Sequence, residues 1–494
     1  MPAPHRDDRR LAGLIQHLHR HPEDIPGAAP PRAAPGPPLE GPDLLGYLFN
    51  DAGNADRIIA LHGAGMRYCH ALRRWLVWDG WRWAADEAGR AEKLAKETAL
   101  AFLRQALDAG QDPAVKWAKS SLDHRRVTSA LASAECELPV APAELDTRAD
   151  TLNCLNGMVD LRTGELAPHE PEYLITKICH HNYTPGAPCP QFLTFLYHIM
   201  GATEGDFPER TARLADYLQR AFGYSLTGLT SEKAVFILHG AGNNGKTTLL
   251  STISKIIEEY SAILQVESLM QRQQDTNNSQ ADLADLRGAR FVMTSETEEG
   301  QRLNEGKLKR ITQGMGRIKA VRKYENPITF EETHKLWMDA NHKPDVRGVD
   351  AAIWSRLHLI PFDVTIPPEE IDRDLPGKLE TEAEGILAWM VAGAMRWYAD
   401  GLGRPPEVSA AGEEWRHASN QVGRFVDEQC IVLLTAEVKA RNLYGAYRKW
   451  AEEAGERAES ETKFSVRLGA LGYTRQHRRE GMIYSGLGFK ETSW

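Results

Sequence analysis

Residues 43–228 mix stretches of helical and strand periodicity. Apolar side chains recur at helical spacing over residues 90–109 and 211–222. Between residues 75 and 83, tryptophans alternate with polar residues, and the pair Asp79-Gly80 predicts the turn of a β-hairpin. A hairpin packed on a helix is favoured over a platform for stacking bases. We therefore predict an accessory α/β domain in this region.

Residues 229–400 alternate short apolar runs with amphipathic segments, which is the order of an α/β domain. Four apolar runs predict strands: 233–238, 290–296, 335–341 and 357–362. After them, residues 375–398 carry apolar side chains at helical spacing and predict one helical extension that packs on this domain.

Residues 401–494 are predicted to form a linker and a small DNA-binding domain. The pattern indicates two helices, 438–454 and 461–471, and then a basic hairpin. Helix, helix and hairpin in this order are typical of a winged helix, whose hairpin would contact duplex DNA. The basic residues expected to bind DNA there are Arg475, Arg478 and Arg479.

The N-terminal residues 1–42 are rich in proline and arginine and predict a flexible leader. They lack the pattern of a secretory signal, so the chain is expected to stay in the cytoplasm. The longest apolar runs fall far short of the ~20 residues that span a bilayer, which argues against a membrane protein. A chain of 494 residues has room for two to four domains.

Composition restricts the mode of any nucleic-acid binding. The chain has 59 Lys and Arg against 68 Asp and Glu, a formal net charge of −9. Such a surface does not suit a protein that coats nucleic acid, so any DNA contact must be local.

Six cysteines are scattered without a CxxC pair, which suits reduced thiols. One group invites comparison with a zinc site: Cys179, His180, His181 and Cys189. Its spacing matches no usual structural-zinc pattern, and a strand end followed by a proline-rich loop is the favoured interpretation.

The strongest chemical signal is the run Gly240-Ala-Gly-Asn-Asn-Gly-Lys-Thr247, which matches GxxxxGK[ST] in full. It lies between a predicted strand and a predicted helix at 246–259, as a phosphate-binding loop requires. Lys246 would bridge the terminal phosphates of ATP, and Thr247 would ligate Mg²⁺. The expected nucleotide-binding residues are Gly240, Gly242, Asn243, Asn244, Gly245, Lys246, Thr247 and Thr248.

Polar residues at the ends of two predicted strands are candidates for further roles in the site. Glu296 fits a Walker B acid, which should lie at the tip of a strand next to the P-loop strand and hold the magnesium shell; Glu298 and Glu299 follow directly as alternatives for part of that role. Asn341 could sense the γ-phosphate and orient water.

A GTPase base-reading motif is disfavoured, because His342 separates Asn341 from Lys343. Arg356 precedes the last strand and suits a finger that reaches a neighbouring subunit's nucleotide, although a surface ion pair fits the spacing equally well.

In this order, the segments GAGNNGKTT, RFVMTSETEEG, EGKLKRITQGMGRIKAVRKY, KLWMDANHKP and AAIWSRLHLIPF resemble superfamily 3 helicases. The resemblance is to the phage and plasmid primase-helicase branch, related to the poxvirus, parvovirus and papillomavirus replication helicases. It implies a P-loop ATPase core of AAA+ type between an α/β accessory domain and a winged helix. The implied roles are phosphate and magnesium binding for Lys246 and Thr247, Walker B for Glu296, an extra motif for Lys309, sensor 1 for Asn341 and arginine finger for Arg356.

The resemblance extends to residues 155–165 and 217–227, which look like the domain that usually precedes this motor. One departure is that Gln313-Gly-Met-Gly316 stands where family members commonly have Gly-Gly-Asp. Residues 318–328 predict a strand, turn and strand, which the family makes a hairpin in a ring's central channel. Lys319, Arg322 and Lys323 would then contact the DNA backbone, whereas an exposed basic edge strand is the alternative.

The expected function is therefore an ATP-dependent DNA helicase in the replication of a phage, plasmid or other mobile element, working as a hexamer. An ATP-switched initiator that binds an origin and unwinds little is the alternative. The short leader leaves no room for a polymerase-type site, so a primase or an initiator is expected as a separate partner.

Overall fold

The computed structural model describes residues 41–271, 283–294, 301–314, 316–321, 327–346, 350–479 and 481–490. Almost all of the predicted leader therefore lies outside the described residues. The chain splits into two compact units. Of the described residues, the first unit contains 41–147, Glu170–Thr176 and Pro188–Thr194, and the second contains Arg148–His169, Lys177–Ala187 and the chain from Phe195 onward. The domain boundaries at residues 43, 229 and 401 stay predictions.

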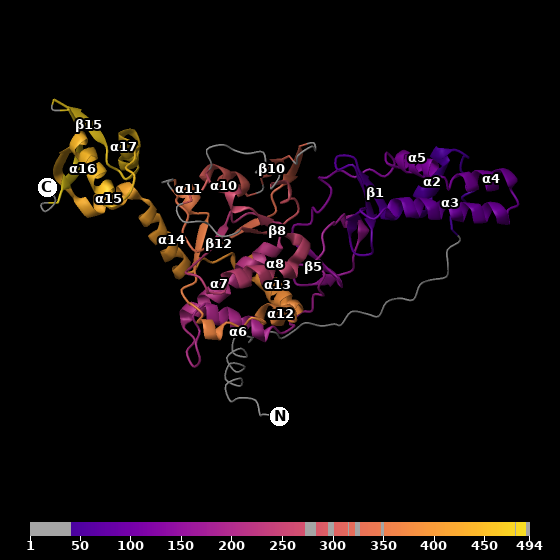
Figure 1. Cartoon of the computed structure of the whole chain (residues 1–494), viewed down its shortest axis with the longest axis horizontal. Coiled ribbons are helices and arrows are strands. Elements are labelled where there is room, and N and C mark those ends of the chain that lie inside the picture. Colours follow the sequence, from indigo (N-terminus) through magenta and orange to yellow (C-terminus); the bar gives the residue numbers. More distant parts are fainter. Residues whose placement is uncertain are drawn as a thin grey trace. The chain divides into compact units, whose positions relative to one another are not determined.

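The first unit combines four helices with a small antiparallel sheet (Figure 1). The helices are α2 (Asp51–His62), α3 (Arg90–Asp108), α4 (Asp112–Ser120) and α5 (His124–Ala134). The strands are β1 (Met66–Cys69), β2 (Arg74–Trp78) and β3 (Trp83–Ala85), in the order β1-β2-β3. Strands β2 and β3 confirm the predicted tryptophan hairpin. Trp83 is buried and donates its Nε1–H to Pro171 O at 2.7 Å, which favours packing over an open platform.

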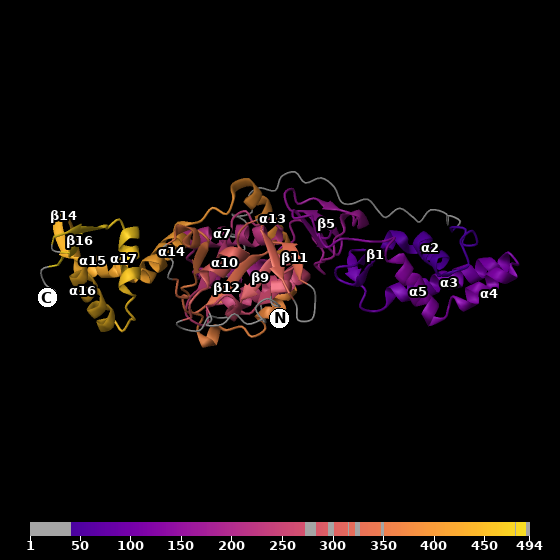
Figure 2. The same cartoon turned by 90° about the horizontal axis from the view of Figure 1, so that it is seen from above.

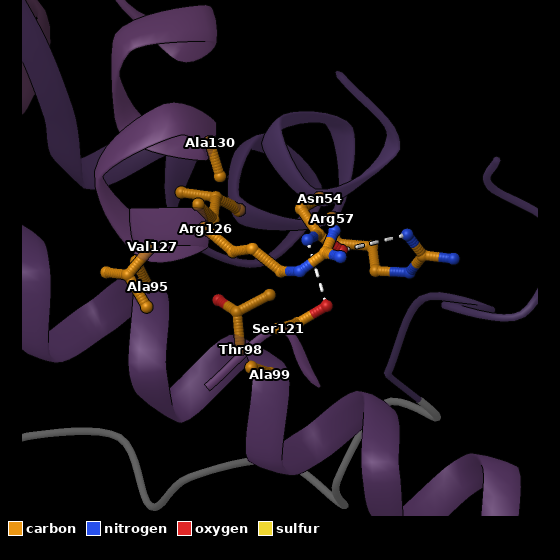
Figure 3. A pocket seen from close by; sticks show the side chains of 10 residues that line it. Asn54, Arg57, Ala95, Thr98, Ala99, Ser121, Arg126, Val127 and Ala130 are labelled. Atoms are coloured by element: carbon orange, nitrogen blue, oxygen red, sulfur yellow. Dashed lines mark hydrogen bonds between the residues drawn. The ribbon is translucent and has the colours of Figure 1, made fainter. Parts of the chain in front are cut away.

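A polar cluster stands among the helices of the first unit (Figure 3). Arg57 is only 1% exposed, and its guanidinium donates hydrogen bonds to the carbonyls of Leu44, Tyr47 and Leu48. Asn54 donates to Ser121 Oγ at 3.0 Å across the adjacent small pocket. Because the buried polar groups satisfy one another, this cluster joins the segment before α2 to the helices and is structural.

The second unit is built on a parallel five-stranded sheet with the order β13-β7-β12-β9-β8 (Figure 2). The strands are β7 (Val235–His239), β8 (Ser261–Leu264), β9 (Phe291–Thr294), β12 (Lys335–Ala340) and β13 (Leu357–Pro361). All four predicted strands are present, and β8 is an additional edge strand. All six residues of β12 are buried, as expected for a central strand covered on both faces.

The two faces of this sheet carry different side chains. On one face, Trp337 of β12 stacks on Phe236 of β7 and on Phe222 of α7 (Glu209–Leu226), each at 4.3 Å between ring centroids. The other face is mainly aliphatic, and its core cluster includes Leu308 of α10 (Glu305–Ile311) and Trp415. Alternating residues of one strand therefore pack against different layers, as strand geometry requires.

Helix α7 crosses α13 (Ala383–Asp400) at two glycines. A Cβ placed on Gly223 would lie 2.1 Å from Ala394 N, and one on Gly393 would lie 2.0 Å from Gln219 O. The backbones therefore approach more closely than any larger residue would permit.

The predicted single helix over residues 375–398 is wrong in one respect. The structure breaks it into α12 (Leu375–Glu380) and α13, and Thr381 Oγ1 donates to Lys378 O at the break. Side-chain hydrogen bonds of this type compete with continued helical pairing. The segment expected to be a linker contains α14 (Pro406–Ser419), which begins with a proline where the missing N–H costs nothing.

The C-terminal part of the second unit has its own core of Phe425, Tyr447, Trp450 and Phe464. Its elements are α15 (Gln421–Gln429), β14 (Cys430–Lys439), α16 (Ala440–Glu453), α17 (Glu461–Ala470), β15 (Arg475–Arg478) and β16 (Gly481–Phe489). The antiparallel sheet has the order β14-β16-β15. The predicted helices and hairpin are present, and α15 and β14 are additional.

The remaining elements of the second unit are short. They are β4 (Thr151–Cys154), β5 (Gly157–Asp160), β6 (Leu166–Ala167), α8 (Lys246–Ile257), β10 (Arg317–Ala320), β11 (Ile328–Glu331) and α11 (Ala351–Trp354). Helix α6 (Pro190–Ile199) begins in the first unit and ends in the second. Within the described ranges, no helix has the length and apolar character needed to cross a membrane.

We predict that Gly223→Ala lowers the free energy of unfolding by about 2 kcal/mol, because overpacking outweighs the ~1 kcal/mol that alanine gains in a helix. The control is Gly412→Ala in α14, where a Cβ meets nothing within 4 Å. That variant should gain about 1 kcal/mol. Chemical denaturation measures both, and equal stabilisation of the two variants would contradict the close crossing.

Candidate nucleotide-binding site

The predicted phosphate loop lies between β7 and α8, at the carboxyl edge of the parallel sheet. Gly245 has φ +80°, and a Cβ there would lie 2.7 Å from Ile199 Cγ2. A Cβ on Gly240 would lie 2.0 Å from Phe362 O. Both glycines are therefore required by the backbone path of the loop.

Asparagines tie this loop to the chain that follows β13. Asn244 is buried and donates from Nδ2 to Phe362 O at 3.4 Å, and Asn243 O accepts the N–H of Ile366 at 2.7 Å. Gly242 is exposed at the tip of the loop, and Thr248 lies in the first turn of α8. The loop is thus anchored on one side by its own asparagines.

Lys246 is the buried centre of the site, with only 3% of its surface exposed. Its Nζ donates to Gly240 O and Asn244 Oδ1 at 2.9 Å each, and to Asn341 Oδ1 at 3.0 Å. The structure therefore brings Lys246 and Asn341 together. A buried ammonium without an anion is costly, and Asp339 Oδ1 lies 3.7 Å from it.

The sequence interpretation missed Asp339, the residue that completes this group. It is buried, and its Oδ2 accepts a hydrogen bond from Thr247 Oγ1. Trp337 and Asp339 are two residues apart in β12 and so share a face of the sheet. Asp339 and Asn341 are also two residues apart, so an extended chain points both side chains to the same side. The sequence Trp-Met-Asp-Ala-Asn could therefore have indicated that Asp339 belongs to the site.

These residues fit a bound nucleotide and magnesium. The Lys246 ammonium donates hydrogen bonds to three neutral oxygens of its own chain. Phosphate oxygens would be stronger acceptors for the same N–H groups. The loop opens into the N-terminus of α8, where backbone N–H groups favour an anion. Carboxylate and hydroxyl oxygens from Asp339 and Thr247 are ligand types that suit Mg²⁺.

One expectation about the Walker B strand is wrong. Strand β9, which leads to Glu296, does not lie next to the P-loop strand, because β12 pairs with both β7 and β9. The carboxylate beside the P-loop strand in the described residues is Asp339. Glu296, Glu298 and Glu299 lie outside the described residues, so the proposed Walker B role of Glu296 stays a prediction.

Lys309 and Arg356 lie on either side of helix α11. Lys309 Nζ forms an ion pair with Asp350, which caps the N-terminus of α11 and whose pKa this hydrogen bond lowers. Arg356 is half-buried and donates from Nε to Thr312 O at 3.4 Å and from Nη1 to Ala352 O. The Arg356 guanidinium thus donates to two backbone carbonyls of its own chain.

The residues proposed to bind DNA are only partly described. Lys319 is exposed on β10, which pairs with β11. The second strand begins at Ile328, where the predicted range ends, and the predicted turn lies outside the described residues. Arg322 and Lys323 lie outside the described residues. Arg475, Arg478 and Arg479 are all exposed, and Arg478 forms an ion pair with Glu437 at 2.7 Å.

The cysteine and histidine group shows no metal geometry. All six cysteines are free thiols. Cys179 is buried and bonds to Ile256 O, and His180 pairs with Glu258. Across the described parts of the chain, no three His, Cys, Asp or Glu side chains are grouped to hold a metal.

Glu332 supplies an acid near the place where the family's Gly-Gly-Asp is absent. It directly follows β11, is 4% exposed, and its Oε2 accepts the N–H groups of Gln313 at 3.0 Å and Gly314 at 3.3 Å. Burial raises its pKa to about 7, against the opposing effects of these two hydrogen bonds and of the Lys335 and Arg356 charges. The residue after β11 thus provides the carboxyl group that holds this loop.

We predict that Glu332 makes folding pH-dependent. In the folded state the Glu332 carboxyl keeps its proton up to about pH 7, whereas in the unfolded chain it loses that proton near its ordinary pKa of 4.5. Stability from this group is therefore present at low pH and is lost as pH rises through that window, by on the order of 3 kcal/mol. Glu332→Gln keeps an oxygen acceptor and should remove this slope.

Denaturant unfolding of the wild type and the variant at several values between pH 5 and pH 8 measures the effect. The charge-matched control is Glu331→Gln, at an exposed neighbouring position, which should keep the wild-type slope. If Glu332→Gln also keeps the wild-type slope of the unfolding free energy against pH, the buried Glu332 carboxyl does not cause that slope.

Comparison with known proteins gives two family matches. Residues 55–201 match the family "D5 N terminal like", and residues 238–356 match a family of unknown function, DUF5906. A candidate helicase of Acanthamoeba polyphaga mimivirus is 23% identical over 60% of this chain and 32% of its own length. One of Frog virus 3 is 23% identical over 49% of this chain and 27% of its own length.

Further similarity is more limited. A candidate helicase of Sputnik virophage is 22% identical over 40% of this chain and 27% of its own length. The chain thus spans about a third or less of the length of these relatives. A solved structure of the C-terminal region of NrS-1 in its apo form is 14% identical, with a TM-score of 0.38, and covers 62% of this chain and 77% of its own.

The order of the matches along the chain agrees with the motifs: the D5-type segment comes first, and the segment with the phosphate loop follows it. Together with the viral relatives, these matches confirm the resemblance found in the sequence: the chain is similar to superfamily 3 primase-helicases of phages and viruses.

Proposed function

We propose that this chain is an ATP-dependent DNA helicase that acts in the replication of a phage, plasmid or other mobile element. The observation that carries the proposal is the group at the carboxyl edge of the sheet, where Lys246 and Thr247 of the phosphate loop contact Asn341, which directly follows β12, and Asp339 of β12. The names of the viral relatives support the assignment to helicases.

The order β13-β7-β12-β9-β8, with the P-loop strand second from one edge, supports a core of AAA+ type. In the proposed chemistry, bound ATP with Mg²⁺ supplies a phosphoanhydride whose hydrolysis drives movement. Lys246 binds the terminal phosphates, Thr247 ligates the metal, Glu296 activates water, and Asn341 orients it. Lys309 positions α11, from which Arg356 extends.

We further propose a hexameric ring in which Arg356 acts on the nucleotide of the neighbouring subunit. Its hydrogen bonds to Thr312 and Ala352 are to neutral carbonyls, which a phosphate would replace with a stronger acceptor. Lys319, Arg322 and Lys323 would then line the channel and contact single-stranded DNA.

A second candidate is an initiator that uses ATP to assemble on an origin and unwinds little. The order α15, β14, α16, α17, β15 and β16, with β16 between the other two strands, favours a winged-helix domain that binds duplex DNA. A separate primase or initiator would be a partner in either case. DNA-stimulated ATP turnover distinguishes the candidates, because an assembly switch hydrolyses little.

We predict that Arg356→Ala binds ATP nearly normally but hydrolyses it at least ~10³ times more slowly, the scale of a lost arginine finger. Lys246→Ala should hydrolyse no ATP, and its thermal unfolding is measured alongside because Lys246 is buried against Asp339. Mixing the two inactive proteins should restore part of the turnover, since some interfaces then combine an intact loop with an intact finger. Normal turnover by Arg356→Ala, or no recovery although subunits exchange, would contradict a shared site.

We predict that removing an exposed wing arginine that contacts a phosphate lowers the salt dependence of duplex binding by about one unit. Arg475→Ala and Arg479→Ala should therefore weaken binding and reduce the slope of log K against log salt. Glu437→Gln should strengthen binding, because it frees Arg478 from its ion pair. Unchanged slopes in the alanine variants would show that these arginines are solvent-exposed charges that do not contact DNA phosphates.

A further inference from the structure

Asp339 occupies a position in the site to which neither the motifs nor the comparisons give a role. It is 4% exposed at the end of β12, and its two oxygens face different partners. Oδ2 accepts the hydrogen of Thr247 Oγ1, and Oδ1 lies 3.7 Å from Lys246 Nζ. One carboxylate thus contacts two consecutive residues of the phosphate loop.

The hydrogen bond to Thr247 has a chemical consequence. A hydroxyl has one hydrogen and two lone pairs. When the hydrogen is committed to Asp339, the lone pairs of Thr247 Oγ1 stay available to a metal ion. The opposite orientation, with Thr247 accepting, is excluded at this partner because an ionised carboxylate has no hydrogen to donate.

The charge of Asp339 also favours the binding of magnesium together with the nucleotide. A buried carboxylate beside the phosphates would repel a nucleotide that lacks magnesium, whereas it attracts the dication. Lys246 compensates that charge within the loop, which explains how the carboxylate can be buried. The pairing of β12 with β7, with Asp339 opposite Leu238, places the carboxylate one residue short of the loop's own strand end.

We infer that Asp339 is a positioning residue that orients the Thr247 hydroxyl for magnesium and makes nucleotide binding depend on the metal. The inference rests on the proposed ATP-binding function and names a residue of that site outside its recognised motifs. Asp339 orients the Thr247 hydroxyl through their hydrogen bond, and its negative charge attracts the magnesium ion. It therefore controls the metal-dependent part of binding, while Lys246 and the loop amides control the part that remains without metal.

The test measures binding of a non-hydrolysable fluorescent ATP analogue to the full chain, with Mg²⁺ and with a chelator. In the wild type, Mg²⁺ should strengthen binding. Asp339→Asn, which keeps the shape but loses the charge, should reduce that gain about tenfold or more, the scale of a charge-assisted contact. Binding without Mg²⁺ should stay equal or become tighter, which a merely structural role would not produce.

Thr247→Val removes the hydroxyl at nearly constant shape and should cause a similar loss of the magnesium gain. The double variant should lose little more than either single variant, because both act through one hydrogen bond. The control is Asp363→Asn, an exposed carboxylate just beyond β13 that pairs with Arg210. It should keep the full magnesium gain.

The outcomes separate the two proposals. A wild type that binds no nucleotide overturns the proposed function. A wild type with a magnesium gain that Asp339→Asn retains, or an Asp339→Asn protein that loses binding equally with and without metal, overturns the inference and leaves the function standing. Additive losses in the double variant would likewise show that Asp339 and Thr247 act independently.

Discussion

A buried ammonium group sets the geometry of the candidate site. Lys246 is 3% exposed, so its charge and its three donors must be satisfied inside the protein. The loop supplies two oxygens, while the neighbouring strand β12 and the residue after it supply the charge of Asp339 and the Asn341 side chain. The pairing of β12 with β7 brings both side chains to the loop.

The fold of the motor was largely predictable from the sequence because its strands are continuous apolar runs and its loop has a specific motif. The edge strand β8 was not, since a half-exposed segment such as Ser261–Leu264 lacks a buried run. The helix over 375–398 was predicted as one because the break at Thr381 depends on a single side-chain hydrogen bond. Helix α14 lies in the segment that was expected to contain a linker, and it begins with a proline, which suits a helix start.

The site was predicted in its motif residues but not in its supporting residues. Lys246 and Asn341 follow from spacing at strand ends, and the structure joins them. Asp339 was passed over because an acid within an apolar run resembles an isolated exception until its strand is known to pair with the P-loop strand. Glu332 was missed for a similar reason, because it is far from Gln313 along the chain and contacts that loop only through tertiary pairing.

Strand β13 joins two parts of the proposed machinery. Arg356 directly precedes it, and Phe362 directly follows it and bonds to Asn244 of the phosphate loop. Ile366, five residues beyond the strand, bonds to Asn243. The five residues of β13 are extended and span about 17 Å, and their pairing with β7 makes this segment resist stretching. In a ring of the proposed kind, a displacement of Arg356 by the neighbouring subunit's nucleotide would therefore be transmitted along β13. It would reach the phosphate loop of the same subunit. Each subunit would then register the state of the next one through a single strand.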